Sequence, residues 1–142
     1  MLFRDADDRV LILEPNYREG WALPGGTIES DDGETPRDAA RRETVEEIGL
    51  DVSPGPLLAI DWVSGPGRPP IASYLYDGGV LTQDQLDAIV LQDEELDSWR
   101  LVPAAELDAY GPPWLVLRVR AALAALEAGA GPAELVQGEP AR

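Results

Sequence analysis

Residues 25–50 read GGTIESDDGETPRDAARRETVEEIGL. The pair Gly25-Gly26 marks a place where the backbone turns sharply or approaches another group closely. Thr35-Pro36 predicts the start of a helix, because threonine is a good N-cap and proline suits the first helical position. Gly49 predicts its end, in the left-handed conformation that a C-cap commonly needs. We therefore expect a helix from Pro36 to Ile48.

Three glutamates share one face of this helix. At about 100° per residue, Glu43, Glu46 and Glu47 fall within an arc of about 100°, beside Ala39 and Ala40. A solvated acidic face is the ordinary interpretation of such a trio in an acidic chain. The small apolar neighbours favour a partly enclosed patch instead, and the glycine turn before the helix can present backbone N–H groups to phosphate. Such a patch suits a divalent ion that bridges to substrate phosphates.

The composition excludes several kinds of catalysis. The chain of 142 residues has neither Cys nor His, and no Lys occurs in it. Thiolate nucleophiles, Ser-His pairs, zinc sites with nitrogen or sulfur ligands and lysine bases are therefore excluded. Any bound metal must have oxygen ligands, which favours Mg²⁺, Mn²⁺ or Ca²⁺. The formal net charge of −16 disfavours long nucleic acids as partners, since their binding depends on Lys and Arg.

The length predicts one domain, over residues 1–128. The remaining residues, 129–142, are rich in Ala, Gly, Pro and Glu, and we expect a mobile tail there. No apolar run approaches the roughly 18 residues of a membrane span, so we expect no membrane partner. No basic start followed by an apolar run occurs either, and the sequence therefore predicts a cytoplasmic protein.

Apolar and β-branched runs predict a mixed sheet. Further helices are indicated within Leu81 to Leu91, where Thr82 is the expected cap, and by the apolar pattern from Pro113 to Ala128. A turn is expected at Asp77-Gly78-Gly79 and a Gly/Pro loop over residues 64–70. Strands are predicted over residues 9–13, 57–63, 71–76 and 96–101. This order of elements argues for an α/β domain in which the sheet lies between helices.

The segment 25–50 resembles the signature box of the Nudix hydrolases. Its second half, Arg42 to Leu50, has the complete Arg-Glu-x-x-Glu-Glu-x-Gly-apolar pattern, and seven residues separate Glu34 from Arg42. The resemblance covers most of residues 10–107. It implies an α/β/α sandwich fold and hydrolysis of a nucleoside diphosphate linked to another moiety. It also implies a homodimer, which is common in this family. One departure is that seven residues separate Gly26 from Glu34 where the family usually has five, so Asp31-Asp32 is interpreted as an insertion.

The resemblance also implies roles for the residues of the box. Glu43, Glu46 and Glu47 would hold Mg²⁺ or Mn²⁺, Arg42 would orient these glutamates through Glu34, and Gly26 would let the loop approach the metal and phosphates. A carboxylate must act as general base in a chain without His. Glu43 and Glu47 are the first candidates, and the family's use of a loop glutamate makes Glu94 and Glu95 the alternatives.

We expect the residues that determine substrate specificity to lie outside the box. Arg18 and Arg68 are expected in loops, where each could bind a phosphate or carboxylate through two hydrogen bonds. Core packing is the better interpretation of each single aromatic residue, but the following could stack on a base: Tyr17, Trp21, Trp62, Tyr74 and Tyr76.

Three functions compete. The first is a hydrolase of a small nucleotide, of the ADP-ribose, nucleotide-sugar or nucleoside-triphosphate class. The second is a non-catalytic nucleotide-binding or regulatory module, against which the intact glutamates argue. The third is the isomerase branch of the family, which relies on a cysteine that this chain does not have.

Overall fold

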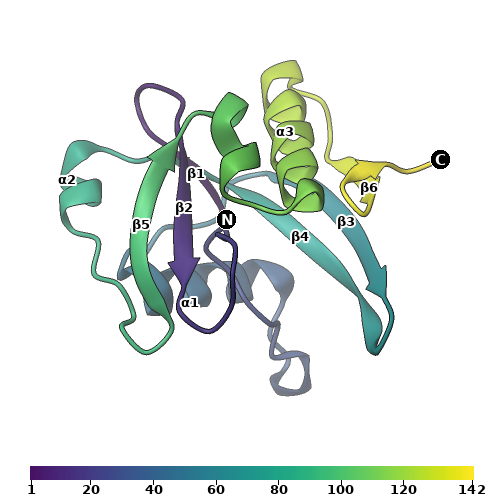
Figure 1. Cartoon of the computed structure of the whole chain (residues 1–142), viewed down its shortest axis with the longest axis horizontal. Helices are drawn as coiled ribbons and strands as arrows, with labels where there is room; N and C mark the ends of the chain where they lie inside the picture. Colours follow the sequence, from purple (N-terminus) through teal and green to yellow (C-terminus); the bar gives the residue numbers. More distant parts are fainter.

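A mixed sheet lies between two layers of helix, as the sequence predicts (Figure 1). The computed structural model describes all 142 residues. The strand order is β5-β2-β1-β4-β3-β6-β7. The strands are β1 Leu2–Arg4, β2 Val10–Pro15, β3 Leu57–Gly65, β4 Arg68–Val80, β5 Leu96–Val102, β6 Ala133–Val136 and β7 Glu139–Pro140. The helices are α1 Pro36–Ile48, α2 Gln83–Asp87 and α3 Pro113–Ala128, with 3-10 turns η1 Ser30–Asp32 and η2 Ala104–Ala109. No helix has the length and apolar character that crossing a membrane requires.

Strand β2, next to the edge strand β5, is buried on both faces, and its two faces contact separate parts of the core. Its side chains alternate in direction along the strand. Val10 and Ile12 belong to the hydrophobic cluster under α3, whereas Leu11 and Leu13 pack with Ile48 at the end of α1. Each helix layer thus covers its own face of the sheet.

Helix α1 begins and ends where the sequence predicts. The Thr35 hydroxyl accepts a hydrogen bond from Asp38 N (3.2 Å), and Thr35 N donates to the Asp38 carboxylate (3.3 Å). At the other end Gly49 has φ 72°. The carbonyls of Glu47 and Ile48 accept bonds from Gln92 N and Val90 N, each of 3.0 Å. These bonds attach the loop between α2 and β5 to the end of α1.

Two details of β4 correct the expected elements. The expected loop over residues 64–70 is only a turn around Pro66-Gly67, and Gly67 has the positive φ of 79° that the third residue of a type II turn requires. The expected turn at Asp77-Gly78-Gly79 is wrong: these residues continue β4 as a bulged pair with β1. Gly78 is needed there because a Cβ atom would overlap the ring of Phe3.

The residues after Gly129 do not form the expected mobile tail. Strand β6 pairs in parallel with β3, and β7 turns back against β6. The sequence holds few apolar residues here, but Leu135 is only 2% exposed and joins the core under α3. In addition, Gly138 N donates a 3.1 Å hydrogen bond to the buried carboxylate of Asp61. Strand pairing, one buried apolar residue and one buried hydrogen bond therefore hold this segment in place.

Candidate active site

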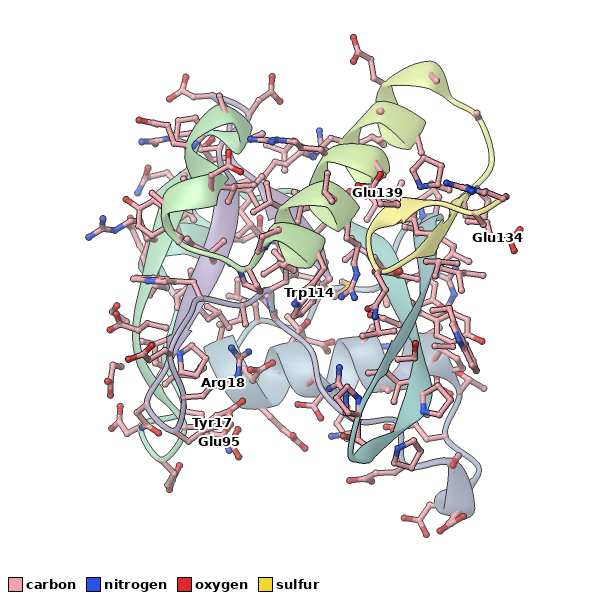
Figure 2. All side chains as sticks on the ribbon, turned by 45° about the vertical axis from the view of Figure 1, so that its right-hand side comes forward. Tyr17, Arg18, Glu95, Trp114, Glu134 and Glu139 are labelled. Atoms are coloured by element: carbon pink, nitrogen blue, oxygen red, sulfur yellow. The ribbon has the colours of Figure 1, made fainter.

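A cleft of about 590 Å³ is lined by Gly25, Gly26 and Glu47 of the box, whereas Arg42, Glu43 and Glu46 are not part of its lining. It is lined by the loop around Gly25-Gly26, by the Ala39 and Glu47 side of α1, by residues 71–75 of β4 and by the first turns of α3. Trp114, at the first turn of α3, lies on the side of the helix toward α1 (Figure 2). Small-molecule sites in proteins commonly measure about 300–1,000 Å³. The cleft is therefore the candidate site.

Arg42 joins the box carboxylates to the glycine loop. Its Nε donates to Glu34 Oε1 (2.6 Å) and its Nη2 to Glu34 Oε2 (3.0 Å), a two-pronged pair that lowers the pKa of Glu34 to about 2. Nη2 also donates to the Thr27 carbonyl (3.0 Å). Nη1 reaches Glu43 Oε1 (3.1 Å) and Glu46 Oε2 (3.2 Å). One guanidinium thus orders two glutamates of the helix.

The extra residues Asp31-Asp32 leave this arrangement intact. They lie in η1, which projects below α1 in Figure 1. The loop closes through hydrogen bonds between Glu29 and Glu34: Glu34 N donates to the Glu29 carbonyl (3.3 Å), and Glu29 N donates to Glu34 Oε2 (2.8 Å). Gly33 allows the return with φ 79°. Glu34 therefore reaches Arg42 despite the insertion.

Glu47 is the buried carboxylate of the site, at 7% exposure. Its Oε1 accepts a 2.6 Å hydrogen bond from Gly25 N. Burial raises the pKa of Glu47 to about 7, and the negative charges of Glu43 and Glu95 act in the same direction. A carboxyl group with this pKa can exchange a proton near neutral pH.

Glu43 lies directly under Gly26. A Cβ atom on Gly26 would overlap the Glu43 carboxylate, so a larger residue here would displace the end of the Glu43 side chain. Burial also raises the pKa of Glu43, and this effect exceeds the opposing influence of Arg42. The glycine loop thus covers two acidic groups whose charged forms are poorly solvated.

The donor set has the chemistry of a divalent-ion site. Glu43, Glu46 and Glu47 supply the hard oxygen atoms that Mg²⁺ or Mn²⁺ prefers. In this structure Glu46 turns toward Arg42 and Glu47 toward Gly25, and no three acidic side chains converge to hold an ion. The Glu46 side chain is 48% exposed, so it has room to rotate. The residues fit such an ion in type, and binding one requires their side chains to turn.

Of the two loop glutamates, Glu95 is the one whose charge raises the pKa of both Glu43 and Glu47. Its backbone is held by a 2.9 Å bond from Asn16 N to the Glu95 carbonyl. Figure 2 shows Glu95 next to Tyr17, on the side of α1 where the loop after β2 passes. This position favours Glu95 over Glu94 as a loop base.

The two arginines expected to bind substrate differ in position. Arg18 lines the cleft, where its Nη1 donates to the carbonyls of Glu19 (3.2 Å) and Gly20 (3.3 Å). Arg68 pairs with Gly65 at the turn between β3 and β4, and it is not part of the cleft lining. The structure therefore brings Arg18 to the site and not Arg68.

Only some of the aromatic residues proposed to stack on a base lie at the cleft. The cleft lining includes Tyr17, Trp21 and Tyr74. Trp62 and Tyr76 are not part of it, and the Tyr76 ring instead packs under the guanidinium of Arg37, 4.6 Å from the ring centre.

The sequence profile of the NUDIX domain matches residues 1–124. The chain belongs to the Nudix family. The uncharacterized Nudix hydrolase YvcI of Bacillus subtilis (strain 168) is 48% identical over 44 residues, which are 31% of this chain and 27% of that protein. The chain thus spans about a quarter of the length of that relative.

Solved structures of Nudix proteins have the same fold. The MutT protein of Methanosarcina mazei Go1 superposes with a TM-score of 0.70 at 22% identity, over 90% of each chain. An ADP-ribose pyrophosphatase of Streptococcus suis 89-1591 gives a TM-score of 0.67 at 19% identity, over 95% of this chain and 93% of that one. At such identities the likeness concerns the fold.

The cleft of this Nudix chain also contains an ion pair that sequence reasoning did not find. Arg118 of α3 lines the cleft, and its Nε donates to Oδ2 of the buried Asp61 at 2.8 Å. Both residues interrupt apolar runs, since Asp61 follows Ile60 in a buried strand and Arg118 precedes Val119 in an apolar helix. A charge at a predicted core position was the signal that could have revealed the pair.

Proposed function

We propose that this Nudix chain is a hydrolase that cleaves the pyrophosphate linkage of a small nucleoside-diphosphate compound, with Mg²⁺ or Mn²⁺ as cofactor. The observation that carries the proposal is the arrangement of Glu43 and Glu47 beneath Gly25-Gly26, with Glu47 and both glycines at the wall of a cleft of nucleotide size. Family membership supports the same reaction class, a hydrolase acting on phosphoric anhydrides.

Each residue of the box has a role in this proposal. Glu43, Glu46 and Glu47 would hold the divalent ion, which supplies charge neutralisation on the phosphates and lowers the pKa of bound water. Arg42 keeps two of these carboxylates in place through the contacts described above. Arg18 stands at the cleft as a donor to a phosphate oxygen.

The chemical step is attack of a water oxygen on one phosphorus of the linkage. The bond from that phosphorus to the bridging oxygen breaks, and the bridging oxygen leaves with the other phosphate. A carboxylate takes the proton of the water. Glu47 is the first candidate for this role because it is buried at the cleft wall and held by Gly25 N, with Glu43 and Glu95 as the alternative bases.

A substrate panel tests the proposal. Purified protein with Mg²⁺ or Mn²⁺ is incubated with ADP-ribose, nucleotide sugars and nucleoside triphosphates, and the products are separated by chromatography. We expect a nucleoside monophosphate from at least one compound and a loss of at least 100-fold in Glu47→Gln. Glu139→Gln is the matched control, since Glu139 is exposed on β7, far from the labelled Glu95 in Figure 2. Nucleotide binding without turnover of any compound would favour the non-catalytic module instead.

A further inference from the structure

Arg118 presents two unused hydrogen-bond donors to the cleft. Its Nε is bound to Asp61, but Nη1 and Nη2 make no hydrogen bond to the protein, and the side chain is only 10% exposed. Neither terminal nitrogen is among the fully buried atoms without a partner, so both have access to solvent in the cleft and their N–H groups are free to bind a ligand. Since Arg118 lines the cleft, a ligand in the cleft is the natural partner.

The Arg118 side chain is held in one orientation. Asp61 is fully buried and accepts bonds from both Arg118 Nε (2.8 Å) and Gly138 N (3.1 Å), which ties together α3, β3 and the turn after β6. The guanidinium also lies over the ring of Trp114, with 4.8 Å between Cζ and the ring centre. Held from two directions, the two free nitrogens form a fixed pair of donors.

The charge of Arg118 is balanced by Asp61. A guanidinium paired with a buried carboxylate offers directional donors with little net positive charge, so it suits a neutral acceptor better than a phosphate. Trp114 and Ile71 line the same cleft and offer apolar surface to a flat group, and the polar Ser73 also lines it. Ser73 lies opposite Asp61 in the register of β3 and β4, so both side chains are on the face that α3 covers.

We propose that Arg118 reads the base of the substrate, and that it selects guanine over adenine. Guanine offers two adjacent acceptors, O6 and N7, which match the paired donors of an arginine, whereas adenine offers one acceptor and one donor on the same edge. In this arrangement the base packs against Trp114 while the diphosphate lies toward Gly25-Gly26 and Glu47. The proposal rests on the proposed function, and it makes the substrates guanosine-diphosphate compounds.

Binding of GMP, AMP and 7-deaza-GMP, measured by calorimetry in the presence and absence of Mg²⁺, tests the proposal without turnover. We expect GMP to bind tighter than AMP by on the order of tenfold. 7-Deaza-GMP, which lacks the N7 acceptor, should lose most of this advantage. Equal binding of GMP and AMP to the wild-type protein would overturn the proposal.

Variants separate the role in recognition from the role in folding. Arg118→Lys keeps a charge beside Asp61, and we expect a folded protein with a GMP to AMP ratio near one. The double variant Arg118→Met, Asp61→Asn removes both charges together and should give the same ratio. Arg120→Lys is the matched control, because Arg120 is on the same helix but bonds Asp108 (2.6 Å) outside the cleft. An unchanged ratio in a folded Arg118→Lys protein, or an equal loss for GMP and AMP, contradicts the proposal.

Turnover measurements distinguish a failure of this proposal from a failure of the proposed function. GDP-glucose and ADP-glucose differ only in the base, and we expect a higher kcat/KM for GDP-glucose in the wild-type protein. Equal kcat/KM values would leave the hydrolase proposal standing and refute the role of Arg118. Selective GMP binding without turnover of either sugar would refute the hydrolase and support the role of Arg118.

Discussion

The backbone N–H of Gly25 donates a 2.6 Å hydrogen bond to Oε1 of Glu47. This bond connects the glycine turn to the helix that follows it, across 22 positions of the chain. It gives the most buried carboxylate of the box one fixed partner. The glycine turn and helix α1 therefore form one structural unit, and a substitution in one should alter the geometry of the other.

Gly26→Ala should impair catalysis, because its new Cβ atom would overlap the Glu43 carboxylate. A displacement of about 1 Å at reacting groups can cost about 100-fold in rate, and we expect a loss of that order in kcat/KM. Gly131→Ala is the control, since a Cβ atom there meets nothing within 4 Å. Equal activity in the two variants would show that the loop does not need to approach Glu43.

The Arg42–Glu34 pair should support the fold above acidic pH. The folded-state pKa of Glu34, about 2, is lower than its ordinary value of 4.5, because Arg42 binds the charged form. The contribution to the free energy of unfolding is therefore complete above pH 4.5 and disappears as the pH falls toward 2. Urea unfolding between pH 2 and 6 should show a smaller decrease for Glu34→Gln than for the wild-type protein. Parallel pH profiles for the two proteins would contradict the pairing.

The contribution of Glu47 to the free energy of unfolding should have the opposite pH dependence when EDTA removes divalent ions. Its folded-state pKa of about 7 lies above the ordinary 4.5, so its contribution is complete below pH 4.5 and is lost as the pH rises through 7. At pH 8 the buried charge should cost roughly 3 kcal/mol, and Glu47→Gln should then be more stable than the wild-type protein. Thermal unfolding at pH 5 and pH 8 measures this. A less stable Glu47→Gln protein at pH 8 would contradict the burial of this charge.

The strand β6 should contribute to stability. Leu135 is 2% exposed in the core, and Leu135→Ala should lower the free energy of unfolding by about 2–5 kcal/mol. The adjacent Val136 is 44% exposed, and Val136→Ala should change the free energy of unfolding by less than about 0.5 kcal/mol. Urea denaturation compares the two variants. A negligible effect of Leu135→Ala would return residues 129–142 to the mobile tail that the sequence suggests.

Local sequence signals predicted the helices that begin at a proline and end at a glycine C-cap. Helices α1 and α3 have the predicted bounds, because Pro36 and Pro113 mark their first residues and Gly49 and Gly129 their C-caps. Strand β6 was missed because its stability comes from pairing with β3, which no local pattern records. The turn expected at Asp77 failed for a similar reason, since Gly78 serves the packing of a distant Phe3.

The site could be predicted in part. The spacing of Glu43, Glu46 and Glu47 indicated one face of α1, and the structure adds the contacts that Arg42 makes with this face. The ion pair of Asp61 and Arg118 joins residues 57 positions apart, so the sequence could indicate each unusual charge but only the fold shows that the two are partners.

Hydrolysis in ¹⁸O-labelled water tests the central claim most directly. With Mg²⁺ and a nucleoside-diphosphate compound that the panel identifies, mass spectrometry should find one ¹⁸O atom in one of the two phosphate products. The reaction should stop in EDTA and fall at least 100-fold in Glu47→Gln, if the buried carboxylate acts as the base. Turnover that continues in EDTA, or at the wild-type rate in a folded Glu47→Gln protein, would contradict the account.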